Sequence, residues 1–289
     1  MTSRRVLVTG AGGQLAAAIL ATFRDCDLVA HTRATCDVTD VDAVARVVRT
    51  AAPAVIVNCA AFNDVDGAED RALEALAVNA FAVRSLARAA EAAGAVLVHY
   101  STDFVIDGEA DQPYSEAVRP SPRSTYGASK LLGEWFALAA PGALVLRVES
   151  LFGSPAGWTG RRGTVDKIVE GLESGRELRV FTDRIVSPSY THDVAAATRH
   201  LVTSGAPPGL YHCVNSGHGS WYDVAREAAA LLGVEPRLVP ITVDQMPLQA
   251  PRPRYCALSP AKLRAAGFDM PTWRDALQRW LTTRNTAVT

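Results

Sequence analysis

The chain has 289 residues, of which 48% are hydrophobic and 20% are charged, so it can bury a large core in one big domain or in two lobes. Its 29 basic and 30 acidic residues leave a formal net charge of −1, which favours neither nucleic acid nor a membrane surface as the main partner. No signal-peptide pattern or apolar run of transmembrane length is present, and the five cysteines include no Cys-x-x-Cys pair. We therefore expect a cytoplasmic protein with reduced thiols and no metal site.

Short apolar runs alternate with longer helical patterns in the first half of the chain. In chain order, the predicted strands are 5–8, 28–30, 55–58, 96–99 and 144–148, and the predicted helices are 14–23, 41–50, 69–93 and 126–139. Strands that are apolar on both faces and alternate with helices are typical of a parallel sheet covered by helices on each side. The sequence therefore predicts the α/β class, with a Rossmann-type doubly wound parallel sheet.

The pattern loosens after residue 148. The predicted loops are 107–125, 154–157 and 186–190, and the predicted later helices are 165–173, a helix that begins near 193, 222–233 and 273–282. This part of the chain looks like a smaller C-terminal lobe completed by more than one segment.

Gly10 and Gly13 lie between the first predicted strand and the first predicted helix. Glycine lets the backbone turn tightly and approach a pyrophosphate, whose charge a helix N-terminus favours. The spacing is Thr-Gly-x-x-Gly-x-x-Ala, with Ala16 where a third glycine often occurs. A glycine turn of an ordinary α/β protein is the alternative interpretation.

No acidic residue closes the second predicted strand, and the chain continues there with Arg33. An acid would bind the ribose hydroxyls of NAD, whereas an arginine suits the 2′-phosphate of NADP. Arg33 therefore favours NADPH, with NADH and a solvated loop arginine as the alternatives. Asp37 and Val38 lie just beyond, at the adenine side, and the small residues Cys59, Ala60 and Ala61 after the third strand leave room for a cofactor or suit plain packing.

Tyr126 precedes Lys130 by four residues, which places both side chains on one helix face. The ammonium can lower the pKa of the phenol from about 10, and a phenol tuned in this way exchanges protons near neutral pH. The pattern arises often by chance, but here the glycine turn and Ser101-Thr102-Asp103 accompany it. Together they indicate a nicotinamide-dependent enzyme that acts on a carbonyl or an alcohol.

Several segments resemble the extended short-chain dehydrogenase/reductases, namely 9–15, 57–62, 100–105 and 126–134. Within that superfamily they are similar to the dTDP-4-dehydrorhamnose reductases, as are 183–190, 252–254, 258–259 and 262–263. The resemblance implies a two-lobe enzyme that uses NADPH to reduce the 4-keto group of a nucleotide-linked deoxysugar.

The resemblance also implies roles for individual residues. The catalytic residues would be Thr102, Tyr126 and Lys130. The cofactor-binding residues would be Gly10, Gly13, Gln14, Leu15, Arg33, Asp37, Val38, Cys59, Ala60, Ala61, Tyr126 and Lys130. The substrate-binding residues would be Thr102, Asp103, Ser150 and Arg252, where the arginine suits a diphosphate. Trp158, Arg161 and Arg162 lie in a loop that we expect near the nucleotide base.

The chain departs from the reductases at Ser150 and at 123–125, where it has Arg-Ser-Thr and the family commonly has an asparagine. Ser150 takes the position where the reductases often carry a tryptophan. Related dehydratases have a Thr-Asp-Glu run, but Phe104 follows Asp103 here, so the second acid is missing from this stretch.

Two other functions remain open on the same scaffold. One is a sugar-nucleotide epimerase, and the other is a non-catalytic, cofactor-binding regulatory subunit. We expect residues 1–153, with returning segments near 181–203, to form the NADP-binding Rossmann domain, and 154–180 and 204–289 to form mainly the substrate-binding lobe. A homodimer is an open alternative to a monomer.

Overall fold

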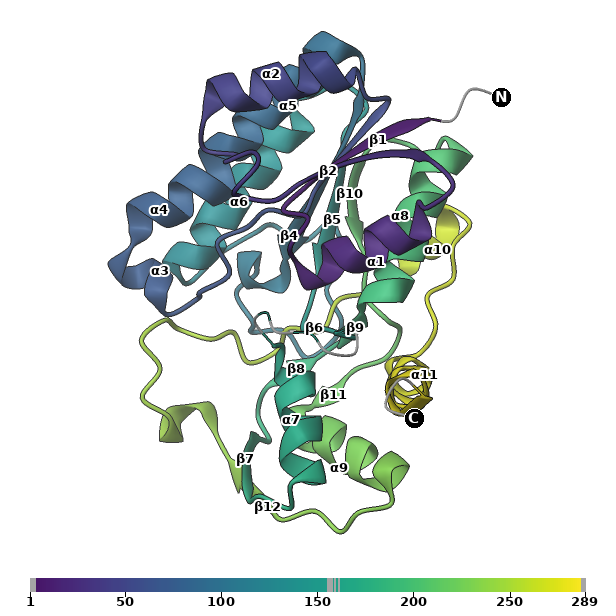
Figure 1. Cartoon of the computed structure of the whole chain (residues 1–289). Helices are drawn as coiled ribbons and strands as arrows, with labels where there is room; N and C mark the ends of the chain where they lie inside the picture. The colour runs from purple at the N-terminus through teal and green to yellow at the C-terminus, as the bar shows by residue number, and fades with distance from the viewer. Residues whose placement is uncertain (1–3, 155–157, 159, 161, 287–289) are drawn as a thin grey trace.

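The computed structural model describes residues 4–154, 158, 160 and 162–286. Within these residues, a central parallel sheet of six strands runs in the order β10-β5-β4-β3-β1-β2 (Figure 1). The strands are β1 (Arg5–Thr9), β2 (Asp27–His31), β3 (Val55–Asn58), β4 (Val96–Thr102), β5 (Leu144–Val148) and β10 (Gly209–His212). The predicted α/β class and doubly wound parallel sheet are confirmed.

Helices cover both faces of the central sheet (Figure 1). On one face, α1 (Gln14–Thr22) and α8 (Thr191–Ser204) pack on the sheet with α10 (Ala261–Ala265) nearby. On the other face lie α2 (Val41–Ala51), α5 (Ala82–Ala93) and α6 (Thr125–Leu138). Each face has its own buried apolar cluster, because the strands carry large apolar side chains on both sides. None of the described helices has the length and apolar character needed to cross a membrane.

The strand order reverses between β1 and β3. The chain moves outward from β1 to β2, and then returns past β1 to build β3, β4 and β5 on the other side. In open α/β sheets, ligands bind outside the carboxyl ends of the strands at such a point of reversal. The order of the strands therefore places a binding crevice beside the ends of β1 and β3.

The predicted single helix over 69–93 is wrong. The segment instead forms α3 (Gly67–Asp70), α4 (Ala72–Leu76), the π-helix η1 (Ala77–Phe81) and α5. The first break falls at Arg71, whose φ of −116° and ψ of 47° leave the helical region. No glycine or proline marks this break in the sequence, so periodicity alone runs straight through it.

A further apolar cluster gathers below the sheet around α7 (Thr164–Glu173), α9 (Trp221–Leu232) and α11 (Trp273–Thr286) (Figure 1). Three small strand pairs join it: β6 (Leu151–Phe152) with β9 (Ser189–Tyr190), β7 (Leu178–Phe181) with β12 (Leu238–Ile241), and β8 (Ile185–Val186) with β11 (Gly219–Ser220). The 3-10 helices η2 (Asp103–Val105) and η3 (Val243–Gln245) complete the described elements. The predicted loop over 186–190 is wrong in part, because it holds the end of β8 and all of β9.

β10 is a strand that the sequence analysis did not predict. It lies within 204–289, which we expected to belong mainly to the smaller lobe, yet it pairs with β5 as the edge of the central sheet. Its sequence, Gly-Leu-Tyr-His, has no run of β-branched residues, so it lacks the pattern of a buried strand. The central sheet is therefore completed only by a segment well beyond residue 203.

Candidate functional site

The glycine turn lies at the end of β1, beside the point where the strand order reverses. Gly10 has a φ of +65°, and a Cβ atom there would stand 2.5 Å from the backbone nitrogen of Ala60. Only glycine therefore permits both this backbone conformation and the close approach to the end of β3. Gly13 is the N-cap of α1, and no side chain caps it, so helical N–H groups remain for an anionic ligand.

Gln14 and Leu15 open α1, and only the first of them faces away from the core. The Gln14 carboxamide lies 2.9 Å from the Ser154 hydroxyl, and with its oxygen on that side it also accepts from the backbone N–H groups of Gly153 and Ser154. Leu15 is buried against the sheet. The first residue of α1 thus ties the glycine turn to the segment that follows β6.

The end of β3 lies against the glycine turn. Asn58 is buried, and its side-chain oxygen accepts from the Thr9 hydroxyl at 2.8 Å and from the Ala60 N–H at 3.1 Å. Its amide nitrogen lies 3.1 Å from Nδ1 of the buried His99. Cys59, Ala60 and Ala61 are half-buried, and burial raises the pKa of the Cys59 thiol to about 12. These small residues therefore form an uncharged wall at neutral pH, as a site for a dinucleotide requires.

Arg33 extends into solvent beyond the end of β2. Its side chain is 90% exposed and lies 3.5 Å from the Asp37 carboxylate. Asp37 also accepts from the N–H and the hydroxyl of Thr39, and the backbone hydrogen bond is the largest cause of its lowered pKa. Val38 beside it is buried. Arg33 is therefore free to turn towards a phosphate without disturbing the core.

The ends of β1 and β3 and the start of α1 have the features that the sequence analysis expects of a dinucleotide site. The N-terminus of α1 is uncapped, Gly10 closely approaches the end of β3, and the residues after β3 are small and uncharged. Gly10, Gly13, Cys59, Ala60 and Ala61 come together here. Arg33, Asp37 and Val38 lie at the neighbouring end of β2, where the Ala11 N–H donates to the His31 carbonyl at 2.9 Å.

Tyr126 and Lys130 lie near the start of α6, which packs against β4 and η2. Ser124 caps this helix by accepting from the Gly127 N–H at 3.1 Å. Gly127 is needed here because a Cβ would stand 2.3 Å from the Phe104 carbonyl oxygen. The tyrosine ring meets the Phe104 ring edge-on, with centroids 5.5 Å apart.

Lys130 is 3% exposed and donates to the Tyr100 carbonyl on β4 at 2.5 Å. Burial lowers the pKa of Lys130 to about 8, and the negative charge of Glu134 partly opposes this shift. The ammonium therefore still predominates at pH 7, but it is poised to lose its proton just above that pH. Such a shift is common where a lysine takes part in chemistry.

Thr102 is the last residue of β4, two positions beyond the carbonyl that Lys130 contacts. Its hydroxyl accepts from the Phe104 N–H at 3.3 Å and donates to the Asp103 carboxylate at 2.9 Å. The structure therefore places Thr102, Tyr126 and Lys130 around the end of β4, where Phe104 contacts both the threonine hydroxyl and the tyrosine ring. These assignments remain predictions of function.

A buried ion pair holds α6 to β5 behind Lys130. The guanidinium of Arg147 donates twice to the Glu134 carboxylate, at 2.7 and 2.8 Å, and both side chains are at most 2% exposed. Nε2 of His212, on β10, lies 3.4 Å from the same guanidinium, whose charge adds to burial in lowering the pKa of this histidine to about 3. His212 is therefore neutral at physiological pH.

Glu149 is a buried acid beside Asp103 that the sequence analysis missed. The carboxylates of Asp103 and Glu149 and the thiol of Cys256 all lie within 4.8 Å of one another. These are potential metal donors, but burial raises the pKa of the Cys256 thiol well above its usual range, and the guanidinium of Arg184 lies 3.6 Å from its sulfur. An arginine therefore already supplies positive charge to this cluster.

Asp103 thus has the second acidic neighbour that its own stretch of sequence lacks. Thr102 pairs with Val148 across β4 and β5, so the residues that follow these two strand ends lie side by side. The register of the sheet, and not the local sequence, brings Glu149 to this place.

Arg252 and Ser150 are the two other predicted substrate-binding residues. Arg252 donates to the Asp66 carboxylate at 2.7 Å and stands over the Phe104 ring, 5.7 Å from its centroid. Burial is the largest cause of its lowered pKa. Ser150 has a φ of +47°, an uncommon conformation for a non-glycine residue, and it lies between β5 and β6. Their substrate contacts remain predictions.

The loop after β6 is described only in part. Arg161 lies outside the described residues, and Arg162 donates to the Trp158 carbonyl at 3.3 Å. The expected contact with a nucleotide base stays a prediction.

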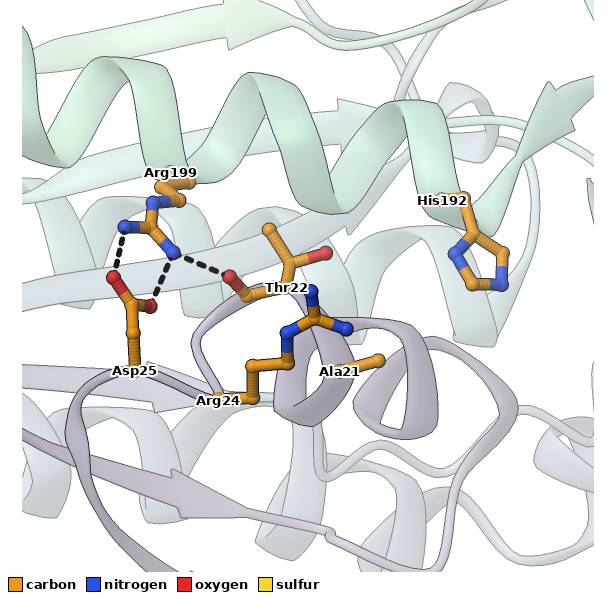
Figure 2. Close-up of a pocket in the computed structure, with 6 residues that line it drawn as sticks. All are labelled: Ala21, Thr22, Arg24, Asp25, His192 and Arg199. Atoms are coloured by element: carbon orange, nitrogen blue, oxygen red, sulfur yellow. Dashed lines mark hydrogen bonds and ion pairs between the residues drawn. The ribbon is translucent and has the colours of Figure 1, made fainter.

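A separate depression of about 580 Å³ lies between α1 and α8 (Figure 2). It is lined by Ala21, Thr22, Arg24, Asp25, His192 and Arg199. Figure 2 shows Arg199 bridging the two helices, with hydrogen bonds to Asp25 and to the Thr22 carbonyl. None of these residues belongs to the predicted site, so this depression has no link to the expected chemistry.

A crevice at the reversal of strand order, with a Tyr–Lys helix beside the fourth strand, is the arrangement of the short-chain dehydrogenase/reductases, and this chain is of that class. It belongs to the family described as "RmlD substrate binding domain", whose model matches residues 4–286.

Named relatives and solved structures agree with this family. The chain is 37% identical over 286 residues to a dTDP-4-dehydrorhamnose reductase of Mycolicibacterium smegmatis. This match covers 96% of the chain and 84% of the relative. It is 36% identical over 285 residues to a probable dTDP-4,6-dihydroxy-2-methyloxan-3-one 4-ketoreductase of Streptomyces antibioticus, with 95% and 93% covered. A crystal structure of the Bacillus anthracis dTDP-4-dehydrorhamnose reductase in complex with NADP superposes with a TM-score of 0.92 at 30% identity, with 97% and 99% covered. The expectation of an oxidoreductase of this family is confirmed.

Proposed function

We propose that this chain uses NADPH to reduce the 4-keto group of a dTDP-linked deoxysugar. The observation that carries the proposal is the meeting of Thr102, Tyr126 and Lys130 around the end of β4, next to the crevice at the end of β1. Two relatives named as reductases of dTDP-linked keto-sugars support the substrate class. The NADP bound to the Bacillus anthracis neighbour supports the cofactor.

In the proposed reaction, the bound cofactor supplies the hydride. Tyr126 gives its phenolic proton to the substrate oxygen as negative charge develops there. The Lys130 ammonium, held by the Tyr100 carbonyl, stabilises the phenolate that results. Thr102 places its hydroxyl beside the same oxygen, and Phe104 fixes the spacing between threonine and tyrosine through its two contacts.

We also propose the division into two lobes. The cofactor-binding lobe consists of residues 1–153 and 181–203, together with β10. The substrate-binding lobe consists mainly of 154–180 and the rest of 204–289. The separate apolar cluster around α7, α9 and α11 supports this division.

The proposed function is tested with the purified chain, NADPH and a dTDP-4-keto-6-deoxysugar. We expect NADPH absorbance to fall with one equivalent of product formed per NADPH consumed. Isomerised substrate without net NADPH consumption would instead indicate an epimerase. A stoichiometric partner enzyme in a pull-down, with no turnover of any keto-sugar nucleotide by the isolated chain, would indicate a regulatory subunit.

Arg33→Ala is expected to weaken binding of NADPH about tenfold and to leave binding of NADH unchanged. The side chain would contact the 2′-phosphate, which only NADPH carries. Because the side chain is highly exposed, the free energy lost should be at the lower end of the range for a charged hydrogen bond. The measurement is the Kd of each cofactor by fluorescence titration. Arg24→Ala, another exposed arginine, serves as the control and should change neither Kd. Equal weakening of NADPH and NADH by Arg33→Ala would contradict this role.

The wild-type kcat/KM is expected to fall as the pH rises through about 8. The folded-state pKa of Lys130 is lowered to about 8, so its ammonium is present below that pH and is lost above it. Lys130→Arg should lower the rate, because the two cations are not interchangeable, but its guanidinium stays charged and should move the alkaline limb upwards. A wild-type profile that stays flat from pH 7 to pH 10 would show that this ammonium is not needed.

A further inference from the structure

The register of the sheet brings Asp103 and Glu149 together in the protein interior, where carboxyl groups are rarely buried. β4 and β5 are parallel neighbours, and each acid is the first residue after its strand. Asp103 is 4% exposed and Glu149 is 1% exposed. Burying two carboxyl groups within 4.8 Å is costly unless they share a proton.

The hydrogen bonds of Glu149 are incomplete. Its Oε2 accepts from the Ser187 N–H at 2.7 Å, but its buried Oε1 has no hydrogen-bond partner in the described structure. An ionised carboxylate in this position would leave a charged oxygen unsatisfied, which is expensive. A protonated Glu149 carries no charge, and a carboxyl oxygen of Asp103 lies within 4.8 Å of one of its oxygens.

The charged and titratable groups around the pair favour a single negative charge. Burial is the largest cause of the raised pKa of both acids, and the charge of Asp103 raises that of Glu149 further. Arg184 opposes these shifts as the nearby cation. Cys256 and Tyr255 also face the pair, and burial raises the pKa of each. Both shifts favour a pair that keeps a proton, and the missing hydrogen-bond partner of Oε1 favours Glu149 as the acid that carries it.

Thr102 connects this pair to the proposed chemistry. Its single hydroxyl hydrogen points at Asp103 Oδ1, so it cannot at the same time be donated to a substrate oxygen. Transfer of the shared proton from Glu149 to Asp103 reverses this: Asp103 then donates to Thr102 Oγ1, and the hydroxyl hydrogen is released towards the substrate. One O–H bond breaks on Glu149 and one forms on Asp103. The negative charge moves to Glu149, where the Ser187 N–H and the Arg184 guanidinium stabilise it.

We propose that Asp103 and Glu149 share one transferable proton, and that this pair is a positioning device that sets the direction in which the Thr102 hydroxyl donates. The shared proton is a property of the free protein, whereas the part played by Thr102 rests on the proposed function. Glu149 is thus a positioning residue that acts through Asp103 and Thr102.

The shared proton is tested by infrared difference spectroscopy of the free protein at neutral pH. We expect the carbonyl stretch of a buried, protonated carboxylic acid in the wild type, sensitive to deuterium exchange, and its loss in Glu149→Gln, which keeps the volume of the side chain. Asp193→Asn removes another buried carboxyl, one that accepts from the Arg279 guanidinium at 2.7 and 3.0 Å, and should leave the band in place. A wild-type spectrum without this band, or a band that survives in Glu149→Gln, overturns the proposal.

The positioning role is tested by kinetics on the same variants. We expect Glu149→Gln to lower kcat about tenfold, the effect of one hydrogen bond, with the Kd of NADPH unchanged. Combining it with Thr102→Val should add little to the loss caused by Thr102→Val alone, because both changes remove the same donor. Fully additive losses overturn the positioning role.

If the infrared band is present and no keto-sugar is reduced by the wild type, the shared proton stands and the proposed function fails. Should Glu149→Gln not fold, Asp103→Asn serves in its place. In this variant kcat should fall by a similar factor, and the infrared band of Glu149 should stay but shift, because its acidic neighbour has gone; an unshifted band overturns the proposal.

Discussion

Replacing Tyr126 with phenylalanine is expected to lower kcat by about 10² to 10⁴-fold, the range for removing a general acid. The ring would keep its edge-on contact with Phe104 and its packing against Ala68 and Ala75, so the fold and the crevice should survive. The change removes the proton that the phenol gives to the substrate oxygen. The measurement is kcat by NADPH absorbance, together with the Kd of NADPH, which should stay near that of the wild type.

Tyr222→Phe is the matched control for this variant. Tyr222 lies at the edge of the apolar cluster around α9, away from β4, and loss of its hydroxyl should leave kcat unchanged. Near-wild-type turnover by Tyr126→Phe would refute the assignment of Tyr126 as the acid. A fall in kcat accompanied by loss of NADPH binding would show instead that the tyrosine serves the cofactor.

Glu134→Gln is expected to lower the free energy of unfolding by about 3–5 kcal/mol, because it leaves the buried Arg147 guanidinium without its carboxylate. The pair is almost fully excluded from water, so solvent cannot replace the lost charge. The measurement is chemical denaturation followed by circular dichroism. The double variant Glu134→Gln/Arg147→Met should recover much of this loss, because the buried charge is removed together with its partner.

An exposed ion pair provides the control for the buried one. Arg5 and Asp27 are also joined at 2.6 Å, but their side chains are 42% and 45% exposed. Asp27→Asn should therefore change the free energy of unfolding by less than about 1 kcal/mol. Equal losses for Asp27→Asn and Glu134→Gln would mean that burial does not decide the strength of the Glu134–Arg147 pair.

The central sheet was predictable from sequence because five of its strands are continuous apolar runs between helical patterns. β10 was not, because an edge strand with glycine, tyrosine and histidine carries no such pattern. The break at Arg71 was not predictable either. It depends on how 67–81 packs, and the Asn79 side chain in this stretch bonds to the Phe62 backbone and to the Ser129 hydroxyl.

The predicted site divides in the same way. Tyr126 and Lys130 are four residues apart, and the glycine turn is contiguous, so local spacing identifies them. Glu149 lies 46 positions beyond Asp103 in the printed sequence, and only the alignment of β4 with β5 makes them neighbours. Arg184 joins them from a third segment. No pattern in the sequence signals such a cluster, apart from an acid at the end of a buried strand.

The late position of β10 has a consequence for synthesis of the chain. When the ribosome has released only the first 153 residues, β5 has an unpaired edge and the α1 face still lacks its cover from α8. Unpaired edges and bare apolar faces favour association with other chains. The central sheet of the nascent protein therefore remains incomplete, with apolar surface exposed to chaperones, until residue 212 has emerged from the ribosome.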